Sequence, residues 1–530
     1  MRLTAFLITI FLLFTSYLAY GQILVSGQVK SSENGETIPG VTVSIKGQAK
    51  GTITDLDGNY QLNVTEGATL IFRFLGYETQ EIMVGNQTII NVILKTSVNS
   101  LEEVIVVAYG EVKKKDITGS VSTVKGEEMM KMANTSLDQA LQGRAAGVQV
   151  TQVSGRPGGE TSIRIRGSSS ISAGNEPLYV IDGMLVLSNN SEIDAGGTYG
   201  APLNALATLN PSDIESIQVL KDASATALYG SRGANGVVLI TTRKGTSGKM
   251  NITFDSYYAV QRVPFTLDLL NGTEFAHYMN DLAEEKGLPE DPKYIVPESF
   301  GEGTDWQDAI FRDAPMQNYQ LTISGGNEFT QYAIGGSYFK QDGIVLNSDF
   351  ERATFRTSLD QKVSKRMNIG ANVNLSHIVT RGVLTGAISP GTGVLLPGSI
   401  TSALLFPPTQ PVLDPNEEGG YTFEDERNRN LPNPVADAQE SDNLTQNSRV
   451  IASVYTDIEI IDDLVFKLNL GVDGFSVKDN RFVPNFLKRT EPNNGDAVIA
   501  TVDGLTWLAE FILKYSKTFN NGHSIDALVG

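Results

Sequence analysis

The second half of the chain alternates hydrophobic and polar residues in runs of about ten. Side chains on a β-strand point alternately to opposite faces, so these runs predict strands with one apolar and one polar face. Strands of outer-membrane barrels and of soluble β-sandwiches both alternate, so the pattern alone leaves both open. The clearest runs are NITFDSYYAV from Asn251, ATFRTSLD from Ala353, NIGANVNLSH from Asn368, LVFKLNLGVD from Leu464 and WLAEFILKYS from Trp507.

The connections between these runs alternate in length. Long connections at 264–317, 381–447 and 478–496 and an intermediate one at DGIVLNSD alternate with tight turns at SGGNE, SKR, IDD and NNGH. Outer-membrane barrels have short turns on the periplasmic side and long loops outside, whereas a sandwich has no reason for this order. The order therefore favours a transmembrane antiparallel β-barrel over residues 250–530.

The runs amount to nine strands up to Gly530. Bacterial single-chain barrels have even strand numbers, and a barrel that encloses a whole domain needs roughly 22 strands, because small barrels are filled by their own side chains. We therefore expect this chain to be the N-terminal part of a longer barrel protein, with an incomplete barrel.

Residues 22–98 contain shorter alternating runs separated by Gly, Asn and Pro, which predict a small β-sandwich of about seven strands. Asp55, Asp57 and Gly58 suggest a calcium loop. The remaining ligands and the closing Glu of an EF-hand are missing, so a tight turn is the better interpretation.

Residues 101–115, LEEVIVVAYGEVKKK, place a β-branched apolar run between two acids and three lysines. The run predicts an exposed, extended peptide that can add as a strand to the sheet edge of another protein; the alternative is a linker strand of the next domain. Residues 116–249 read as a compact mixed α/β domain, through TSIRIRGS, PLYVIDGM, IESIQVLK, DASATALYG and GVVLITTRKG.

Residues 1–21 predict a cleaved signal peptide, with Arg2 before an apolar run and Ala19 and Gly21 at its end. A membrane anchor helix is the alternative. The net charge of −19 argues against a nucleic-acid partner. The absence of cysteine excludes a disulfide scaffold, the three histidines lie far apart, and no enzyme motif is complete, so we expect no metal, no cofactor and no enzyme activity.

Several long motifs resemble the TonB-linked outer-membrane transporters of the SusC/RagA type. They are LEEVIVVAYG, SIRIRGSSSISAGNEPLYVIDGM, DIESIQVLKDASATALYGSRGANGVVLITTRKG and a stretch from TDWQDAIFRD to ERATFRTSLD. Residues 22–98 resemble the carboxypeptidase-regulatory-like domain, through PGVTVSIKG, GTITDLDGNYQL and LIFRFLGYETQ. The resemblance implies a mainly β protein, in which residues 116–249 are a plug inside the barrel.

The family implies energy-coupled import of a large nutrient, a glycan or a peptide, across the outer membrane. Its partners would be the TonB complex of the inner membrane, a SusD-like surface lipoprotein that acts as a lid, and outer-membrane lipid. Contact with TonB falls on Val104, Ile105, Val106, Val107, Ala108 and Tyr109, and the plug motifs contain Arg164, Arg166, Gly167, Asp182, Gly183, Tyr229, Gly230 and Arg232.

Two interpretations of individual side chains stay open. Arg164 and Arg166 are expected either to pair with carboxylates of the barrel lumen and hold the plug, or to be solvated on the plug surface. The loop aromatics Trp306 and Tyr421 fit sugar stacking and loop packing equally well.

Three other functions compete with nutrient import. A passive porin would lack the plug, and a secreted adhesin would stay soluble after signal cleavage. A TonB-dependent siderophore or vitamin receptor is the nearest alternative, although it would usually lack residues 22–98 and the lid.

Overall fold

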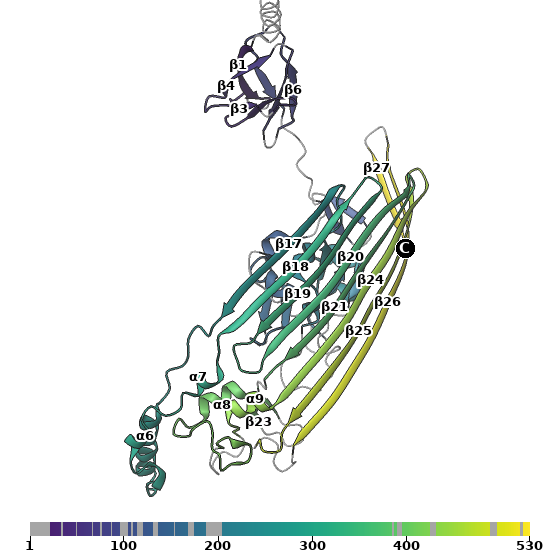
Figure 1. Cartoon of the computed structure of the whole chain (residues 1–530). Helices are drawn as coiled ribbons and strands as arrows, with labels where there is room; N and C mark the ends of the chain where they lie inside the picture. The colour runs from purple at the N-terminus through teal and green to yellow at the C-terminus, as the bar shows by residue number, and fades with distance from the viewer. Residues whose placement is uncertain are drawn as a thin grey trace, which may run out of the picture. The chain divides into compact units, whose positions relative to one another are not determined.

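The computed structural model describes residues 22–32, 35–48, 50–65, 67–74, 77–85, 87–95, 104–107, 110–113, 120–130, 136–152, 154–167, 174–186, 204–383, 386–388, 395–423, 431–487, 495–519 and 523–530 (Figure 1). The predicted signal peptide, residues 1–21, lies outside these ranges. The chain divides into two compact units, one of residues 1–105 and 112–116 and one of residues 106–111 and 117–530.

The first unit contains a β-sandwich of two sheets. One has the order β4 (Asn59–Thr65), β1 (Gln22–Ser31), β7 (Val92–Leu94), and the other β3 (Gly51–Ile53), β2 (Thr42–Ile45), β5 (Thr69–Arg73), β6 (Gln80–Met83). Val43, Leu62 and Phe72 lie in its apolar core. The Asp55 carboxylate accepts hydrogen bonds from the backbone N–H groups of Asp57 (3.0 Å) and Asn59 (2.8 Å), which is the tight turn that the sequence predicts.

Residues 120–247 form a mixed α/β domain, the plug. Its main sheet has the order β10 (Val121–Lys125), β15 (Ile214–Leu220), β16 (Val237–Thr242), β13 (Leu178–Ile181), β14 (Met184–Val186), and β11 (Val148–Gln152) pairs with β12 (Thr161–Ile165). The helices are α2 (Gly126–Met129), α3 (Leu137–Leu141) and α5 (Ala223–Thr226), with the 3-10 turns η3 (Ala205–Thr208), η4 (Pro211–Asp213) and η5 (Ala227–Gly233). Buried side chains from the sheet, the hairpin and the helices α2 and α3 share one core. Ala225 of α5 packs with other sheet residues in a second, smaller core.

Nine strands of the described residues form one antiparallel sheet in chain order, the wall (Figure 1). They are β17 (Gly248–Gln261), β18 (Ala314–Gly326), β19 (Thr330–Asp342), β20 (Asp349–Ser364), β21 (Met367–Arg381), β24 (Asp442–Ile461), β25 (Leu464–Val483), β26 (Asp496–Thr518) and β27 (Ser524–Val529). Tight turns join β18 to β19, β20 to β21 and β24 to β25, while long connections follow β17, β21 and β25. The predicted strand count and the predicted order of turns are both confirmed.

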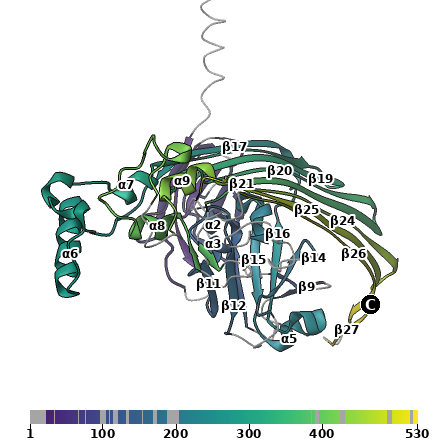
Figure 2. The same cartoon turned by 90° about the horizontal axis from the view of Figure 1, so that it is seen from below.

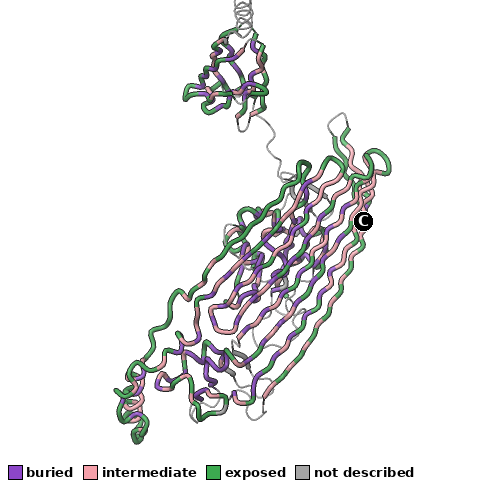
Figure 3. Tube along the Cα trace, in the orientation of Figure 1, coloured by how far each residue is buried: buried purple, intermediate pink, exposed green. Residues whose placement is uncertain are grey.

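The wall buries its polar face and exposes its apolar face. On β20, Arg352, Thr354, Arg356 and Ser358 are buried while Phe355 is 46% exposed, and on β26 Trp507 is 74% exposed. Figure 3 shows this alternation along the strands, and Figure 2 shows the plug on the concave side of the sheet. A soluble sandwich would bury its apolar face, whereas strands of an outer-membrane barrel turn that face to lipid. The exposure of the apolar face therefore identifies these strands as barrel strands rather than strands of a soluble sandwich.

The long connections carry short helices at one end of the wall. Between β17 and β18 lie α6 (Gly272–Glu285), η6 (Pro292–Tyr294), η7 (Pro297–Phe300) and α7 (Trp306–Ile310). Between β21 and β24 lie β22 (Gly386–Ile388), β23 (Leu395–Pro397), α8 (Ser399–Leu405), η8 (Glu418–Gly420) and α9 (Pro434–Glu440). None of the helices in the described part of the chain is long and apolar enough to span a membrane.

Candidate functional site

The segment that the sequence assigns to TonB contact is extended in the structure. β8 (Val104–Val107) pairs with β9 (Gly110–Lys113) in a sheet that contains these two strands of the described residues. Ala108 and Tyr109 lie between them, outside the described residues. Among the described residues, each of these two strands has one edge without a strand partner.

The first plug strand is fastened where it enters the domain. Asp222 accepts hydrogen bonds from the backbone N–H of Ser120 and from the guanidinium of Arg166. These two bonds lower the pKa of the Asp222 carboxyl. The neighbouring Lys221 donates from Nζ to Ser122 Oγ (2.5 Å) and to the carbonyl oxygen of Ala146 (2.6 Å). We call these contacts the entry clasp.

The entry clasp bears on the two interpretations of Arg166 that the sequence leaves open. Arg166 pairs with a carboxylate of the plug itself, not with one of the barrel lumen. Its backbone has a φ of 59° and that of Gly167 a φ of 100°, so two consecutive residues lie at positive φ where β12 ends. Arg164 lies on the exposed side of β12 and acts electrostatically on Glu176, another plug carboxylate.

The VIDGM motif forms a tight hairpin between β13 and β14. Asp182 and Gly183 have φ values of 47° and 85°, as a two-residue turn with two left-handed positions requires. The Asp182 carboxylate accepts hydrogen bonds from the backbone N–H (2.9 Å) and the hydroxyl (2.6 Å) of Thr242, at the end of β16. The motif therefore fixes the turn that faces the wall.

The chain bends at Gly230, inside η5 and within the motif YGSRG. Gly230 has φ 62° and ψ −150°, a conformation that side chains rarely allow. Arg232 is exposed and Tyr229 is half-buried. Tyr229 lines a cavity of about 840 Å³ between plug and wall, together with Asp182 and Gly183 of the plug and charged wall residues such as Asp360 and Glu510.

Two buried arginines of β20 hold the plug to the wall. Arg352, 1% exposed, donates from Nη1 to the carbonyl oxygens of Ala207 (2.9 Å) and Leu209 (3.0 Å), at the end of η3. Arg356, 4% exposed, donates from Nη2 to Thr242 Oγ1 (2.6 Å) and to the carbonyl oxygen of Arg243. We call Arg352 and Arg356 the wall anchors.

A polar contact on β18 reinforces the wall anchors. Gln320 donates from Nε2 to Asp213 Oδ1 (3.3 Å) and accepts from Asn210 Nδ2 (3.3 Å). Burial raises the pKa of the Asp213 carboxyl, and the positive charges of Arg356, Arg352 and Arg243 act in the opposite direction. Opposite charges therefore do face one another between plug and wall. The arginines, Arg352 and Arg356, belong to the wall and the carboxylate, Asp213, to the plug, whereas the sequence suggested plug arginines and wall carboxylates.

Sequence reasoning missed the wall anchors, although a signal for them exists. The alternation of ATFRTSLD places Arg356 on the polar face, and Arg352 lies four residues earlier on the same face. A charged side chain on the inner face of a plugged barrel lies toward the plug or the lumen, so the alternation makes both residues candidates for contact with the plug.

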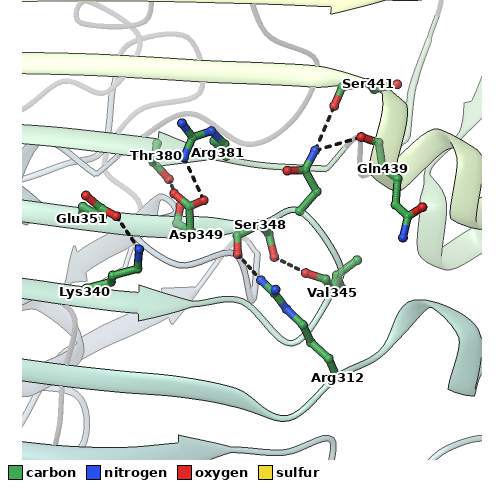
Figure 4. Close-up of polar contacts among 11 residues, drawn as sticks. Arg312, Lys340, Val345, Ser348, Asp349, Glu351, Thr380, Arg381, Gln439 and Ser441 are labelled. Carbon is green, nitrogen blue, oxygen red and sulfur yellow. Dashed lines mark hydrogen bonds and ion pairs between the residues drawn. The ribbon is translucent and has the colours of Figure 1, made fainter.

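The rim of the wall, where the long connections start, is tied together by polar contacts (Figure 4). Arg312 donates to the carbonyl oxygens of Gly343 (3.0 Å) and Ser348 (3.0 Å), and Asn347 donates to that of Ser441 (3.3 Å). The loop after β19 is thereby fixed both to the residues just before β18 and to the connection before β24.

The helices α7, α8 and α9 pack on one apolar core above this rim. Trp306 is 3% exposed, donates from Nε1 to the carbonyl oxygen of Pro407 (3.0 Å), and packs edge-on against Phe406. Tyr421 is 8% exposed and donates to Glu440 (2.9 Å). Both aromatics therefore serve loop packing, and the sugar-stacking interpretation is wrong for them.

A buried acid joins α3 to the part of the plug that Arg352 holds. Asp138 is 2% exposed, and its carboxylate accepts a hydrogen bond from Asn204 Nδ2. Asn204 also caps η3, since its Oδ1 accepts from the N–H of Leu206 (2.8 Å). Burial raises the pKa of Asp138 from 3.8 to about 7, with a further contribution from Glu176.

We expect the plug to lose stability as the pH rises from about 4 to about 7. The unfolded chain releases the Asp138 proton near pH 3.8, whereas the folded plug keeps it until about pH 7. Within this window the folded state binds more protons, so stability falls with pH, by on the order of 4 kcal/mol. Hydrogen exchange of α3 and η3 amides in the full gene product, corrected for intrinsic rates, measures the slope.

The matched variant is Asp138→Asn, which resembles the neutral acid in shape. It should flatten the pH dependence of exchange in α3 and η3. If the variant keeps the slope of the unmodified protein, another group carries the pH dependence.

Among the described residues, no cluster of three or more His, Asp or Glu side chains could hold a metal ion.

Two family models match the chain. The TonB-dependent Receptor Plug Domain matches residues 113–237, and the CarboxypepD_reg-like domain matches residues 25–106. TonB-dependent receptor P3 of Formosa agariphila is 39% identical over 100% of this chain and 50% of its own length. TonB-dependent receptor SusC of Bacteroides thetaiotaomicron is 39% identical over 76% of this chain and 38% of its own length.

Among solved structures, the RagAB peptide importer in its open-open state matches with a TM-score of 0.66 and 25% identity, over 80% of this chain and 48% of that chain. The chain thus spans about half the length of the curated relatives it matches. The family models cover the sandwich and the plug, and the relatives extend the similarity through the wall. The chain belongs to the TonB-dependent receptors of the outer membrane, in the branch of the SusC/RagA type.

Proposed function

We propose that the protein imports a large nutrient, a peptide or a glycan, across the outer membrane with energy from the TonB complex. The observation that carries the proposal is the plug, which fills the polar concave side of the wall and is preceded by a strand-forming segment. A domain anchored inside a barrel blocks diffusion. Import therefore requires energy to displace the plug. Because the outer membrane holds no ATP of its own, this energy must come from elsewhere.

We propose that TonB exerts this force on the strand-forming segment. Val104 to Tyr109 would join a sheet of TonB by strand addition, which grips backbone rather than a particular side chain. Along the chain the segment lies between the last sandwich strand, β7, and the first plug strand, β10, so a pull on it reaches β10 through a short connection.

A SusD-like lipoprotein is the proposed partner on the outer side. The related importer of known structure, RagAB, is described as a peptide importer. The packed platform of α7, α8 and α9 gives a lid a firm surface at the rim of the wall. The domain at residues 25–106 also favours this branch over a siderophore or vitamin receptor.

The test replaces Val104 to Tyr109 by a Gly-Ser linker of equal length in the full gene product. Uptake of fluorescein-labelled casein peptides, or of labelled maltodextrins, should be lost, because the grip is gone. Binding of the same probe to cells treated with a protonophore should stay unchanged, because capture at the surface needs no TonB.

The matched control replaces residues 114–119 by the same linker and should keep most of the uptake. Loss of surface binding together with uptake would instead make Val104 to Tyr109 a structural strand.

A further inference from the structure

We propose that a groove on the outward face of the wall binds one acyl chain of lipopolysaccharide, with the carbonyl group that links this chain to its sugar head at His377 and Ser448. The inference goes beyond the proposed function, because it concerns the face of the wall that points away from the plug. The groove measures about 750 Å³, within the usual range of ligand pockets. We call it the outer groove, and its apolar lining is Phe355, Leu375, Val450, Val472, Gly474 and Leu505.

The outer groove lies in the interior of the sheet. Its middle is formed by β21, β24 and β25, and each of these strands pairs with a neighbouring strand on both sides (Figure 1). The apolar side chains on either side of it point outward, since Phe355 is 46% and Leu505 72% exposed. The shape of the groove is therefore set by paired strands.

The outer groove begins where the outward face of the wall changes from polar to apolar. The row of directly opposed residues that marks the change is Ala353, His377, Ser448, Ser476 and Asp503. The row nearer the long connections, mostly polar, is Glu351, Val379, Gln446, Lys478 and Thr501. The row on the other side is Phe355, Leu375, Val450, Gly474 and Leu505, which are all apolar. Such a change marks the edge of the apolar band that meets acyl chains.

The connections show which leaflet this edge belongs to. β21 ends at Arg381, just beyond His377, and the long connection to β24 starts there. Long connections of outer-membrane barrels lie outside the cell. The edge at His377 and Ser448 therefore belongs to the outer leaflet, and in this membrane that leaflet is built of lipopolysaccharide.

A glycine opens the outer groove. In the apolar row Gly474 lies between Val450 and Leu505. The nearest atoms to a Cβ placed on Gly474 would be Leu505 Cδ1 at 3.4 Å and the carbonyl oxygen of Gly504 at 3.9 Å, so the sheet leaves a gap over this glycine. Atoms that line a gap lose van der Waals contacts unless another group fills it. An acyl chain fills such a gap, and Val472, one row further on, extends it toward the middle of the membrane.

The polar pair at the start of the groove suits the linkage of such a chain. His377 Nδ1 and Ser448 Oγ share a hydrogen bond of 2.9 Å. If Ser448 donates, the imidazole keeps its other N–H, and if His377 donates, Ser448 keeps its hydroxyl hydrogen. One donor thus remains at the edge of the apolar band, where leaving it without an acceptor costs free energy. Acyl tails offer no acceptor, whereas the ester or amide carbonyl at the start of the chain does.

Shape and this donor must provide the selection. Between groove and bulk lipid there is no hydrophobic driving force, because lipid tails are as apolar as the side chains of the groove. A chain is therefore retained only where it fits the gap and where its carbonyl meets the donor. Both conditions are combined at Gly474, His377 and Ser448.

The test measures which lipid stays on the full gene product when it is purified from the outer membrane in a mild detergent. Native mass spectrometry identifies and counts the retained lipid. Gly474→Leu fills the outer groove. Gly336→Leu adds the same side chain between Leu321 and Phe355 of the same apolar row, outside the groove, where a Cβ would meet only the carbonyl oxygen of Thr354 at 3.9 Å. Heat-modifiable migration on a gel checks that both variants are folded barrels.

We expect the unmodified protein and Gly336→Leu to retain one lipopolysaccharide, and Gly474→Leu to retain at least about tenfold less, because the leucine occupies the space of the chain. Equal retention in Gly474→Leu would overturn the proposal. Equal loss in the two leucine variants would also overturn it, as would phosphatidylethanolamine as the retained lipid.

A second variant tests the polar pair without filling the groove. His377→Leu combined with Ser448→Ala removes the donor, and the loss of one hydrogen bond should lower retention roughly two- to tenfold. The control Thr357→Val removes a hydroxyl from the same face outside the groove and should leave retention unchanged. Full retention in the double variant would overturn the placement of the carbonyl at His377 and Ser448.

Discussion

Methionine in place of Arg352 is expected to loosen the plug and to open a leak that needs no TonB. The variant removes both hydrogen bonds to the carbonyl oxygens of Ala207 and Leu209, which stay buried against the wall. Two lost bonds to a charged donor cost on the order of 3 kcal/mol, which corresponds to roughly a hundredfold faster exchange of the η3 amides. The leak should admit large hydrophilic antibiotics that an intact outer membrane excludes.

Two comparisons separate anchoring from loss of a charge. Lys340→Met removes a cation from the adjacent strand, where Lys340 pairs with Glu351 at 2.7 Å in a partly exposed contact, and should cause no leak. Arg352→Lys keeps the charge but lacks the forked donor group, so it should leak less than Arg352→Met. The leak should persist when Val104 to Tyr109 is replaced. A leak that requires this segment would mean that Arg352 governs the pull rather than the seal.

Much of this architecture can be predicted because strands of the wall carry a local signal. In ATFRTSLD or WLAEFILKYS, the position of each residue in the alternation predicts the face on which its side chain lies. The lengths of the connections predict which ends of the strands lie on the periplasmic side. The seven strands of the sandwich, the mixed plug and the nine strands of the wall follow from such patterns. Burial then adds one decisive fact, that Thr354 and Arg356 face inward while Phe355 faces out.

Partners across the chain cannot be predicted in this way. Arg352 meets Ala207 across 145 residues, and Arg166 meets Asp222 across 56 residues. The first pairing depends on how the plug lies against the wall and the second on how the plug itself folds, and no local pattern encodes either. The sequence left two interpretations of Arg166 open, lumen pairing and surface solvation; in the structure this half-exposed side chain pairs with the plug's own Asp222.

The sequence could not decide between the two interpretations of the loop aromatics for a similar reason. Trp306 and Tyr421 lie in long connections, where an aromatic residue is as suitable for a ligand as for packing. Only the fold shows that α7, α8 and the residues before α9 meet and bury both rings.

The polarity of the wall gives the last prediction, in which arginine replaces Trp507. Trp507 lies near the middle of β26 and is 74% exposed on the apolar face. If this face meets lipid, a charge at mid-height lowers the free energy of unfolding by about 2–4 kcal/mol. If it met water, as in a soluble sandwich, the same change would cost at most about 0.5 kcal/mol. Urea unfolding of the full gene product in lipid vesicles measures the difference.

The matched variant is Thr506→Arg, one residue earlier and on the opposite face. Thr506 is half-buried and pairs across the sheet with Asp473, whose carboxylate is already bound by Arg449 at 2.7 Å. A further arginine there meets a polar interior and an acidic neighbour, so it should cost much less than the charge on the apolar face. Equal costs at Thr506 and Trp507 would contradict a lipid-facing wall, because only lipid makes the two sides of one strand so unequal for the same charge.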